Sequence, residues 1–314
     1  MSSTDLHVVL GAGPAGTAIV AELAGRGLAV RHVDRETING APTGVETHQA
    51  DISRPEAAIA ATDAASVIYH AINVAYHRQV EAMPTIANNI LTAAERHDAK
   101  VVVLDTLYPY GEADGEHITE ATTWAATSRK GKLRAELDRR YLDAHSSGAV
   151  RTAMGRSADF FGPGVLNSTL GAAFFPGALT GQSALAFGDI QLPHSYSYIR
   201  DIARGLATLG TTDRGDGKVW HLPTVPALST TEIHRIVEDI TGKPIEVDLL
   251  TEAKPYGPFD ETFMAEYAEM FYQHRIPQNM VSTAFESTFG QHPTPLRDAL
   301  HDTIDWYREY LART

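Results

Sequence analysis

The sequence predicts an α/β protein built on a Rossmann-type, doubly wound parallel sheet, with a smaller C-terminal α/β domain for the substrate. Three observations predict this fold. Apolar strand-like runs alternate with helical patterns through the first half of the chain, which is typical of a parallel sheet covered on both faces. A Gly-x-Gly-x-x-Gly motif at 11–16 follows the first run, and an acid, Asp34, ends the second. The length of 314 residues suits one large and one smaller domain.

The first βαβ unit is expected between Leu6 and Asp34. Residues 6–10 form an apolar run, and apolar residues at helical spacing follow the glycine motif. The first glycine permits a tight turn, the second lets a pyrophosphate approach the backbone, and the third lets the helix lie close to the strand. Free N–H groups at the helix N-terminus would bind the phosphates. The predicted phosphate loop consists of Gly11, Gly13, Pro14, Ala15 and Gly16.

The residues that end the next strands predict which dinucleotide binds. Asp34 suits the ribose hydroxyls of NAD, whereas Arg35 could pair with the 2′-phosphate of NADP; we favour NAD. Asp51 and Ile52 end a short third strand, where Asp51 either reaches the adenine amino group or caps a helix at Pro55. The alternative to dinucleotide binding is a glycine turn in a βαβ unit without a ligand.

The remaining elements follow in order along the chain. Strands are expected at 45–49, 65–72, 100–104 and 150–154, with a helix at 130–144. Residues 196–209 and 219–222 are expected to return to the sheet. Ser229 and Glu232 form a capping box for a helix that ends at Gly242, and the last helix spans about 295–311. We therefore assign 1–163 to the dinucleotide-binding domain, to which 192–224 return, and 164–314 mainly to a substrate-binding domain.

Composition excludes several classes of function. The net charge of −13 argues against nucleic acid or an anionic membrane as partner. The absence of cysteine excludes disulfides and a cysteine nucleophile and favours the cytoplasm. We expect no targeting segment, no membrane span and no metal site, because no long apolar run and no His-Glu-x-x-His pattern occurs.

Taken together, several motifs resemble the extended, atypical short-chain dehydrogenase/reductase superfamily, and within it the NAD-dependent epimerase/dehydratases. The resemblance covers nearly the whole chain. It depends on five segments, which are 11–16, 105–111, 132–136, 159–164 and 198–203.

The resemblance implies a set of catalytic residues, one of which is missing. In the superfamily a Ser or Thr, a Tyr and a Lys act together, with Tyr and Lys four residues apart on one helix. Thr106 matches the Ser/Thr and Lys132 matches the Lys, which also holds the cofactor ribose, but Ser128 stands where the Tyr is expected. We prefer Tyr108 as the substitute acid, with Tyr196 and Tyr198 as alternatives. Tyr108 could instead be a packed loop aromatic, and Thr106 only a turn residue.

The substrate pocket departs from the pattern of nucleotide-sugar epimerases. The resemblance implies an Asn and an Arg near the substrate diphosphate, but Asp159 and His194 occupy these positions. Phe160 and Tyr196 are expected to line the pocket beside them. These side chains predict a small, largely apolar carbonyl or alcohol substrate and not a nucleotide sugar.

The sequence therefore predicts an NAD(P)-dependent oxidoreductase of small carbonyl or alcohol molecules. Two alternatives stay open. One is an epimerase or dehydratase that uses bound NAD transiently, and the other is a protein that senses NAD(P) without catalysis. Pairing of two copies into a homodimer is implied by the resemblance.

Overall fold

A parallel seven-stranded sheet forms the centre of the computed structural model, which describes residues 5–113, 117–256 and 259–313. Its strand order, β11-β6-β5-β4-β1-β2-β3, turns at β1 and β4, as in a doubly wound fold. This confirms the predicted fold class. The strands are β1 (Leu6–Leu10), β2 (Ala29–Asp34), β3 (Glu46–Gln49), β4 (Ala65–His70), β5 (Lys100–Thr106), β6 (Thr152–Ser157) and β11 (Val219–His221).

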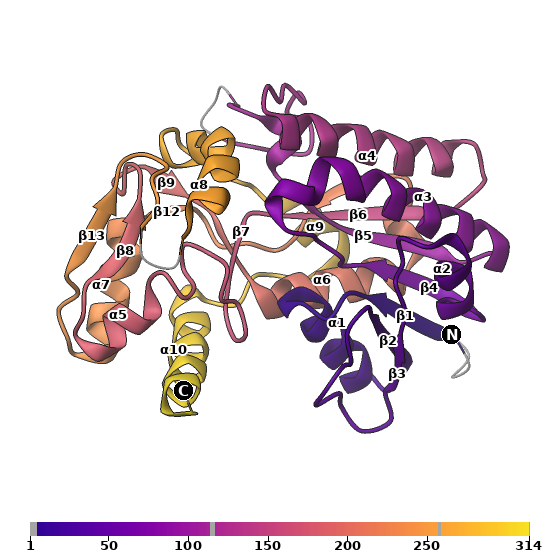
Figure 1. Cartoon of the computed structure of the whole chain (residues 1–314), viewed down its shortest axis with the longest axis horizontal. Coiled ribbons are helices and arrows are strands. Elements are labelled where there is room, and N and C mark those ends of the chain that lie inside the picture. The colour runs from indigo at the N-terminus through magenta and orange to yellow at the C-terminus, as the bar shows by residue number, and fades with distance from the viewer. Residues whose placement is uncertain (1–4, 114–116, 257–258, 314) are drawn as a thin grey trace.

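Helices cover both faces of this sheet (Figure 1). On one face α1 packs beside α6, and on the other α3 lies between α2 and α4. Ile19, Val20 and Leu23 of α1 are almost fully buried, as their helical spacing predicts. The flanking helices are α1 (Pro14–Gly25), α2 (Pro55–Ala61), α3 (Gln79–His97), α4 (Arg129–Ser146), α6 (Ile199–Gly210) and α9 (Thr283–Phe289).

The C-terminal part forms a smaller α/β body at one end of the sheet (Figure 1). Two-stranded pairings hold it together: β8 with β13, β7 with β10, and β9 with β12. Its elements are β7 (Asp159–Phe161), α5 (Phe175–Thr180), β8 (Ala184–Phe187), β9 (Pro193–His194), β10 (Tyr196–Tyr198), β12 (Leu228–Ser229), α7 (Thr230–Thr241), β13 (Val247–Leu250), α8 (Glu261–Tyr267) and α10 (Leu296–Arg313). The 3₁₀ turns are η1 (Tyr76–Arg78), η2 (Tyr108–Tyr110), η3 (Asp213–Gly215) and η4 (Ala268–His274).

Several local predictions are confirmed and others need correction. The capping box of α7 is present, and Gly242 ends this helix with φ of +68°. β11 does return to the sheet beside β6. The strand at 196–198 does not return, because it pairs with β7 outside the sheet, although α6 after it packs on α1. β6 begins at Thr152 and not at 150, because its pairing with β5 begins there.

No helix in the described residues is long and apolar enough to cross a membrane.

Candidate functional site

The glycine loop between β1 and α1 has the shape that a dinucleotide requires. Gly11 has φ of +105°, and a Cβ there would lie 2.9 Å from the carbonyl oxygen of Ala71. A Cβ on Gly16 would lie 1.8 Å from the carbonyl oxygen of Gly11, so only glycine lets α1 approach β1 this closely. A Cβ on Gly13 would meet nothing within 4 Å, which leaves room for a ligand. No side chain caps α1, so its first N–H groups are free for phosphate oxygens.

Pro14 and Ala15 begin α1 within this loop. Pro14 stands in the first turn, where its missing N–H costs no hydrogen bond, and Ala15 is buried against the sheet. The loop, including both residues, therefore fits a dinucleotide diphosphate.

The acid at the end of β2 also stabilises this loop. Asp34 accepts hydrogen bonds from the backbone N–H of Ala12 at 2.7 Å and of Glu36 at 3.0 Å. Arg35 is exposed and lies 3.7 Å from the Glu36 carboxylate. An acid fixed beside the loop suits the ribose of NAD, whereas Arg35 is already next to an acid of its own.

Asp51 and Ile52, which follow β3, are each held by contacts within the chain. Asp51 accepts hydrogen bonds from the hydroxyl and the N–H of Ser53, so it closes a local turn and does not cap α2 directly. Ile52 is buried, and its carbonyl accepts a hydrogen bond from Asn89 of α3.

A cavity of about 160 Å³ lies where the C-terminal part meets the carboxyl ends of β5 and β6. Residues from both halves of the chain line it. The sheet side contributes Asn73, Tyr76, Thr106, Tyr108 and Ser157, and the C-terminal side contributes Asp159, Phe160, Phe263, Tyr267, Gln273 and Gln278. Ligands of doubly wound sheets bind at this edge, so the cavity is the candidate substrate site.

Thr106 and Tyr108 both reach the cavity, as predicted. The Tyr108 hydroxyl is hydrogen-bonded to the Tyr76 hydroxyl at 2.8 Å, and the Tyr108 N–H lies 3.4 Å from the Thr106 hydroxyl. Burial, together with Tyr76 and the Asp159 charge, raises the pKa of Tyr108 well above its usual value. Tyr108 is therefore a protonated hydroxyl at neutral pH, suited to donate a hydrogen bond.

Asp159 and His194, the two residues that depart from the nucleotide-sugar pattern, are hydrogen-bonded to each other. His194 Nε2 donates to Asp159 Oδ2 at 3.0 Å. Burial acts to raise the pKa of Asp159, but the hydrogen bond and charge of His194 outweigh it, so this pKa is lowered. In the described part of the chain the second oxygen, Oδ1, has no hydrogen-bond partner, and Asp159 lines the cavity beside Phe160.

Tyr196 and Tyr198, the other tyrosines predicted near the site, do not contribute to the cavity lining. Tyr196 is buried, accepts a hydrogen bond from Thr169 and packs its ring 4.8 Å from that of His194. The hydroxyl of Tyr198 donates to Asp302, which also pairs with Arg200.

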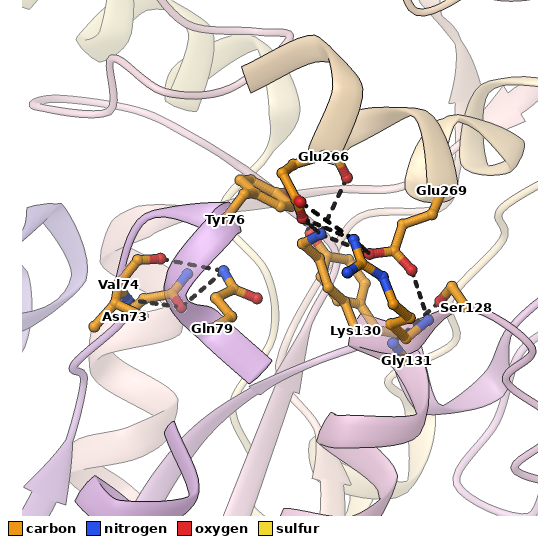
Figure 2. A network of polar contacts seen from close by, with 11 residues as sticks. Asn73, Val74, Tyr76, Gln79, Ser128, Lys130, Gly131, Glu266 and Glu269 are labelled. Carbon is orange, nitrogen blue, oxygen red and sulfur yellow. Dashed lines mark hydrogen bonds and ion pairs between the residues drawn. The ribbon is translucent and has the colours of Figure 1, made fainter. Parts of the chain in front are cut away.

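The basic residues of α4 are arranged differently from the prediction. Ser128, at the position of the expected tyrosine, is the N-cap, and its hydroxyl accepts a hydrogen bond from the Gly131 N–H. Lys132 is exposed and does not line the cavity. Lys130 instead is fully buried, and Figure 2 shows it between Glu266 and Glu269, each 2.6 Å from its Nζ. This ion pair attaches α8 and η4 to α4.

Sequence reasoning missed the side chains that α8 and η4 bring to the cavity. Tyr267 lines it, and its hydroxyl lies 2.5 Å from His274 Nε2. Burial lowers the pKa of His274 to about 3, so this imidazole is neutral at pH 7. No local motif marks either residue, because the pair depends on the folding of a distant segment onto η1 and α4.

Comparisons with known proteins agree with this geometry. Residues 7–222 match the model of the NAD dependent epimerase/dehydratase family. No curated protein matches the sequence significantly. Among solved structures, MoeE5 in complex with UDP-glucose and NAD has a TM-score of 0.79 at 20% identity, covering 98% of this chain and 99% of that one.

Two other similar structures have assigned activities. UDP-glucose 4-epimerase from Thermotoga maritima has a TM-score of 0.78 at 18% identity, with coverage of 98% and 99%. DesIV, a dTDP-glucose 4,6-dehydratase from Streptomyces venezuelae with NAD bound, has a TM-score of 0.78 at 19% identity, with coverage of 97% of each chain.

These findings confirm NAD as the cofactor and correct the predicted substrate. The matched family is NAD-dependent, and the structural neighbours are nucleotide-sugar enzymes. The prediction of an oxidoreductase for a small, largely apolar carbonyl is therefore wrong, and the epimerase/dehydratase alternative is better supported. The prediction failed because it assumed that Asp159 and His194 both face a substrate diphosphate, whereas they are bonded to each other.

Proposed function

Because the chain belongs to the NAD-dependent epimerase/dehydratase family, we propose that it is an epimerase or dehydratase of a nucleotide-linked sugar. The nucleotide-sugar enzymes among its structural neighbours support this substrate class. When bound, NAD supplies a reversible oxidation of an alcohol carbon, so no net reduction or oxidation of the cofactor is expected.

The observation that carries the proposal is the polar lining of the cavity. Hydroxyl, amide and carboxylate groups reach it from both halves of the chain, and they include Asn73, Thr106, Asp159, Thr169, Gln273 and Gln278. Such groups match the hydroxyls of a sugar ring better than an apolar carbonyl compound. Phe160 and Phe263 supply apolar surface beside them, which suits the C–H faces of the ring.

The oxidation of a sugar hydroxyl requires a group that accepts its proton. Asp159 is suited to this role, because it lines the cavity, its pKa is lowered, and its Oδ1 has no hydrogen-bond partner among the described residues. The tyrosines beside it are poor bases, because burial raises the pKa of Tyr108 and of Tyr267 well above the usual value. We therefore assign proton transfer to Asp159, with His194 as its positioning residue.

Thr106 and Tyr108 then serve as hydrogen-bond donors to the substrate oxygen. Both hydroxyls lie at the carboxyl end of β5, and both residues line the cavity. A protonated Tyr108 stabilises negative charge that develops on this oxygen without becoming a base itself. Lys132 has no part in this arrangement, because it is exposed outside the cavity.

The test is turnover of a panel of UDP- and dTDP-sugars by the purified protein with NAD. Products are followed by NMR, and the absorbance of NADH is recorded in the same samples. We expect one sugar to be converted to an epimer or a dehydrated product while NADH does not accumulate. NADH formed in proportion to product would contradict the proposal, as would the absence of conversion across the panel.

The proposal retains two expectations, a homodimer, which the family resemblance implies, and a cytoplasmic location, which the absence of cysteine favours. The dimer is checked by light scattering after size-exclusion chromatography. A particle of twice the chain mass of 34.0 kDa is expected, and a particle of one chain mass would contradict it.

A further inference from the structure

Helix α4 carries four cations in its first six residues, and they differ in how their charges are compensated. Arg129 is exposed and pairs with Glu266 and Glu269. Lys130 is fully buried between Glu266 and Glu269. Lys132 is exposed to water. Arg134 is only 6% exposed, yet no ion pair joins its guanidinium to a carboxylate within residues 5–113, 117–256 and 259–313.

The only hydrogen bond that Arg134 makes within these residues is to an uncharged side chain. Its Nη2 donates to Asn73 Oδ1 at 3.0 Å, and its Nε is buried without any acceptor. Burying a guanidinium without an anion costs several kcal/mol, and proteins normally avoid this by pairing the charge. An anion that is not part of the chain is therefore expected beside Arg134.

The position of Asn73 indicates where this anion would lie. Asn73 is two residues beyond Ala71, whose carbonyl packs against Gly11 of the phosphate loop. Asn73 also lines the cavity, and its Oδ1 accepts hydrogen bonds from Gln79 and from the Val74 N–H (Figure 2). The segment that contacts Arg134 thus joins the phosphate loop to the substrate cavity.

A dinucleotide that extends from the loop into the cavity must pass this segment. Its middle carries the negative charges of the diphosphate, and a planar guanidinium can bind phosphate oxygens with two parallel hydrogen bonds. We propose that Arg134 is the cofactor-binding cation of α4 and that its guanidinium compensates the diphosphate of bound NAD, with Asn73 holding it in place. Lys132 does not take this role.

The test is NAD binding by isothermal titration calorimetry, with no turnover involved. Arg134→Gln is expected to weaken the affinity for NAD, and for ADP-ribose, by about tenfold or more, which corresponds to about 1.4 kcal/mol. Lys132→Gln, the matched control on the same helix, is expected to stay within about twofold of the wild type. Circular dichroism checks that each variant is folded.

Three results would overturn the inference. The first is unchanged NAD affinity in Arg134→Gln, and the second is a large loss in Lys132→Gln instead. The third is weaker binding of UDP with unchanged binding of NAD, which would assign Arg134 to the substrate diphosphate. If Arg134→Gln does not fold, Arg134→Lys is measured in its place. This variant keeps the positive charge but loses the two parallel hydrogen-bond donors of the guanidinium. An NAD affinity equal to that of the wild type would contradict the inference.

This inference rests on NAD as cofactor and not on the sugar substrate. If the substrate panel shows no conversion but Arg134→Gln still weakens NAD binding, the proposed function fails and the role of Arg134 stands. If a sugar is converted but Arg134→Gln binds NAD as well as the wild type does, the proposed function stands and Arg134 has no role in cofactor binding.

Discussion

Two charged regions at the same edge of the sheet differ in how their charges are balanced. In the first region, Arg156 of β6 is fully buried. Its guanidinium nitrogens lie 2.6 Å from a carboxylate oxygen of Asp105 and 2.5 Å from one of Asp138, and the guanidinium stacks on the ring of Tyr110. Beside it, and within the residues that the structure describes, Arg134 has no carboxylate partner and one oxygen of Asp159 has no hydrogen bond.

The difference separates stability from ligand binding. The charge of the Arg156 guanidinium is compensated within the chain, because it lies between the carboxylates of Asp105 and Asp138. The charges of the second region are incomplete, and a bound cofactor and substrate would complete them. Variants in the first region should therefore change stability, and variants in the second should change binding and turnover.

The largest effect is expected from Arg156→Met. It leaves two buried carboxylates next to each other without a cation, so the free energy of unfolding should fall by about 3–5 kcal/mol. Urea unfolding followed by circular dichroism measures this change. Arg140→Met, which removes an exposed i,i+4 pair with Glu136, is the control and should cost about 0.5 kcal/mol or less. A loss below about 1 kcal/mol for Arg156→Met would contradict the statement that this region serves stability.

Asp159→Asn should lower turnover and leave the stability of the fold unchanged. It keeps the shape of the side chain but removes the proton acceptor, so kcat should fall by about 10²- to 10³-fold with the fold intact. Turnover of the sugar identified from the panel measures the loss, and NAD affinity should stay unchanged. Asp305→Asn on the exposed face of α10 is the control. Full activity of Asp159→Asn would remove this residue from proton transfer.

His194→Gln should shift the pH dependence of turnover. In the wild type, His194 lowers the pKa of Asp159 against the effect of burial, so the active carboxylate persists into acid. Without the imidazole, burial is less opposed and the pKa rises. As the pH falls, activity should therefore be lost at a higher pH than in the wild type. A pH–rate profile of kcat measures this shift, and an unchanged acidic limb would show that His194 does not act on Asp159.

The smallest effect is expected outside both regions, at the start of α7. Ser229 accepts a hydrogen bond from the Glu232 N–H, and the Glu232 carboxylate bonds back to the Ser229 N–H. Ser229→Ala should cost about 1 kcal/mol of stability without changing NAD affinity. Thermal unfolding with and without NAD checks both statements. A change in affinity would mean that the C-terminal part is coupled to the cofactor site.

The sequence was sufficient for features with a local cause. The glycine loop, β1, α1 and the α7 capping box depend on steric rules and periodicity within about 20 residues, and all are present. β11 was also placed correctly in the sheet. In the cavity, Thr106 and Tyr108 were predicted because they follow the expected strand at 100–104 and because of the family resemblance, and Asp159 and Phe160 because of that resemblance.

The rest depends on contacts between distant segments. Tyr267 lines the cavity, with His274 bonded to its hydroxyl, because α8 and η4 are held on α4 by Lys130, 136 residues before Glu266. Packing of α4 against β4, β5 and α3 determines which side of the helix faces the core. As a result Lys132 is exposed and Arg134 is buried. No motif in the sequence records either contact.

The most direct test of the proposed function follows one hydrogen atom. A nucleotide sugar is deuterated at the carbon that is oxidised and then converted by the enzyme with NAD. Transient use of the cofactor predicts that the deuterium is found in the product sugar and that free NADH carries none. Deuterium that accumulates in NADH in proportion to product would contradict the account.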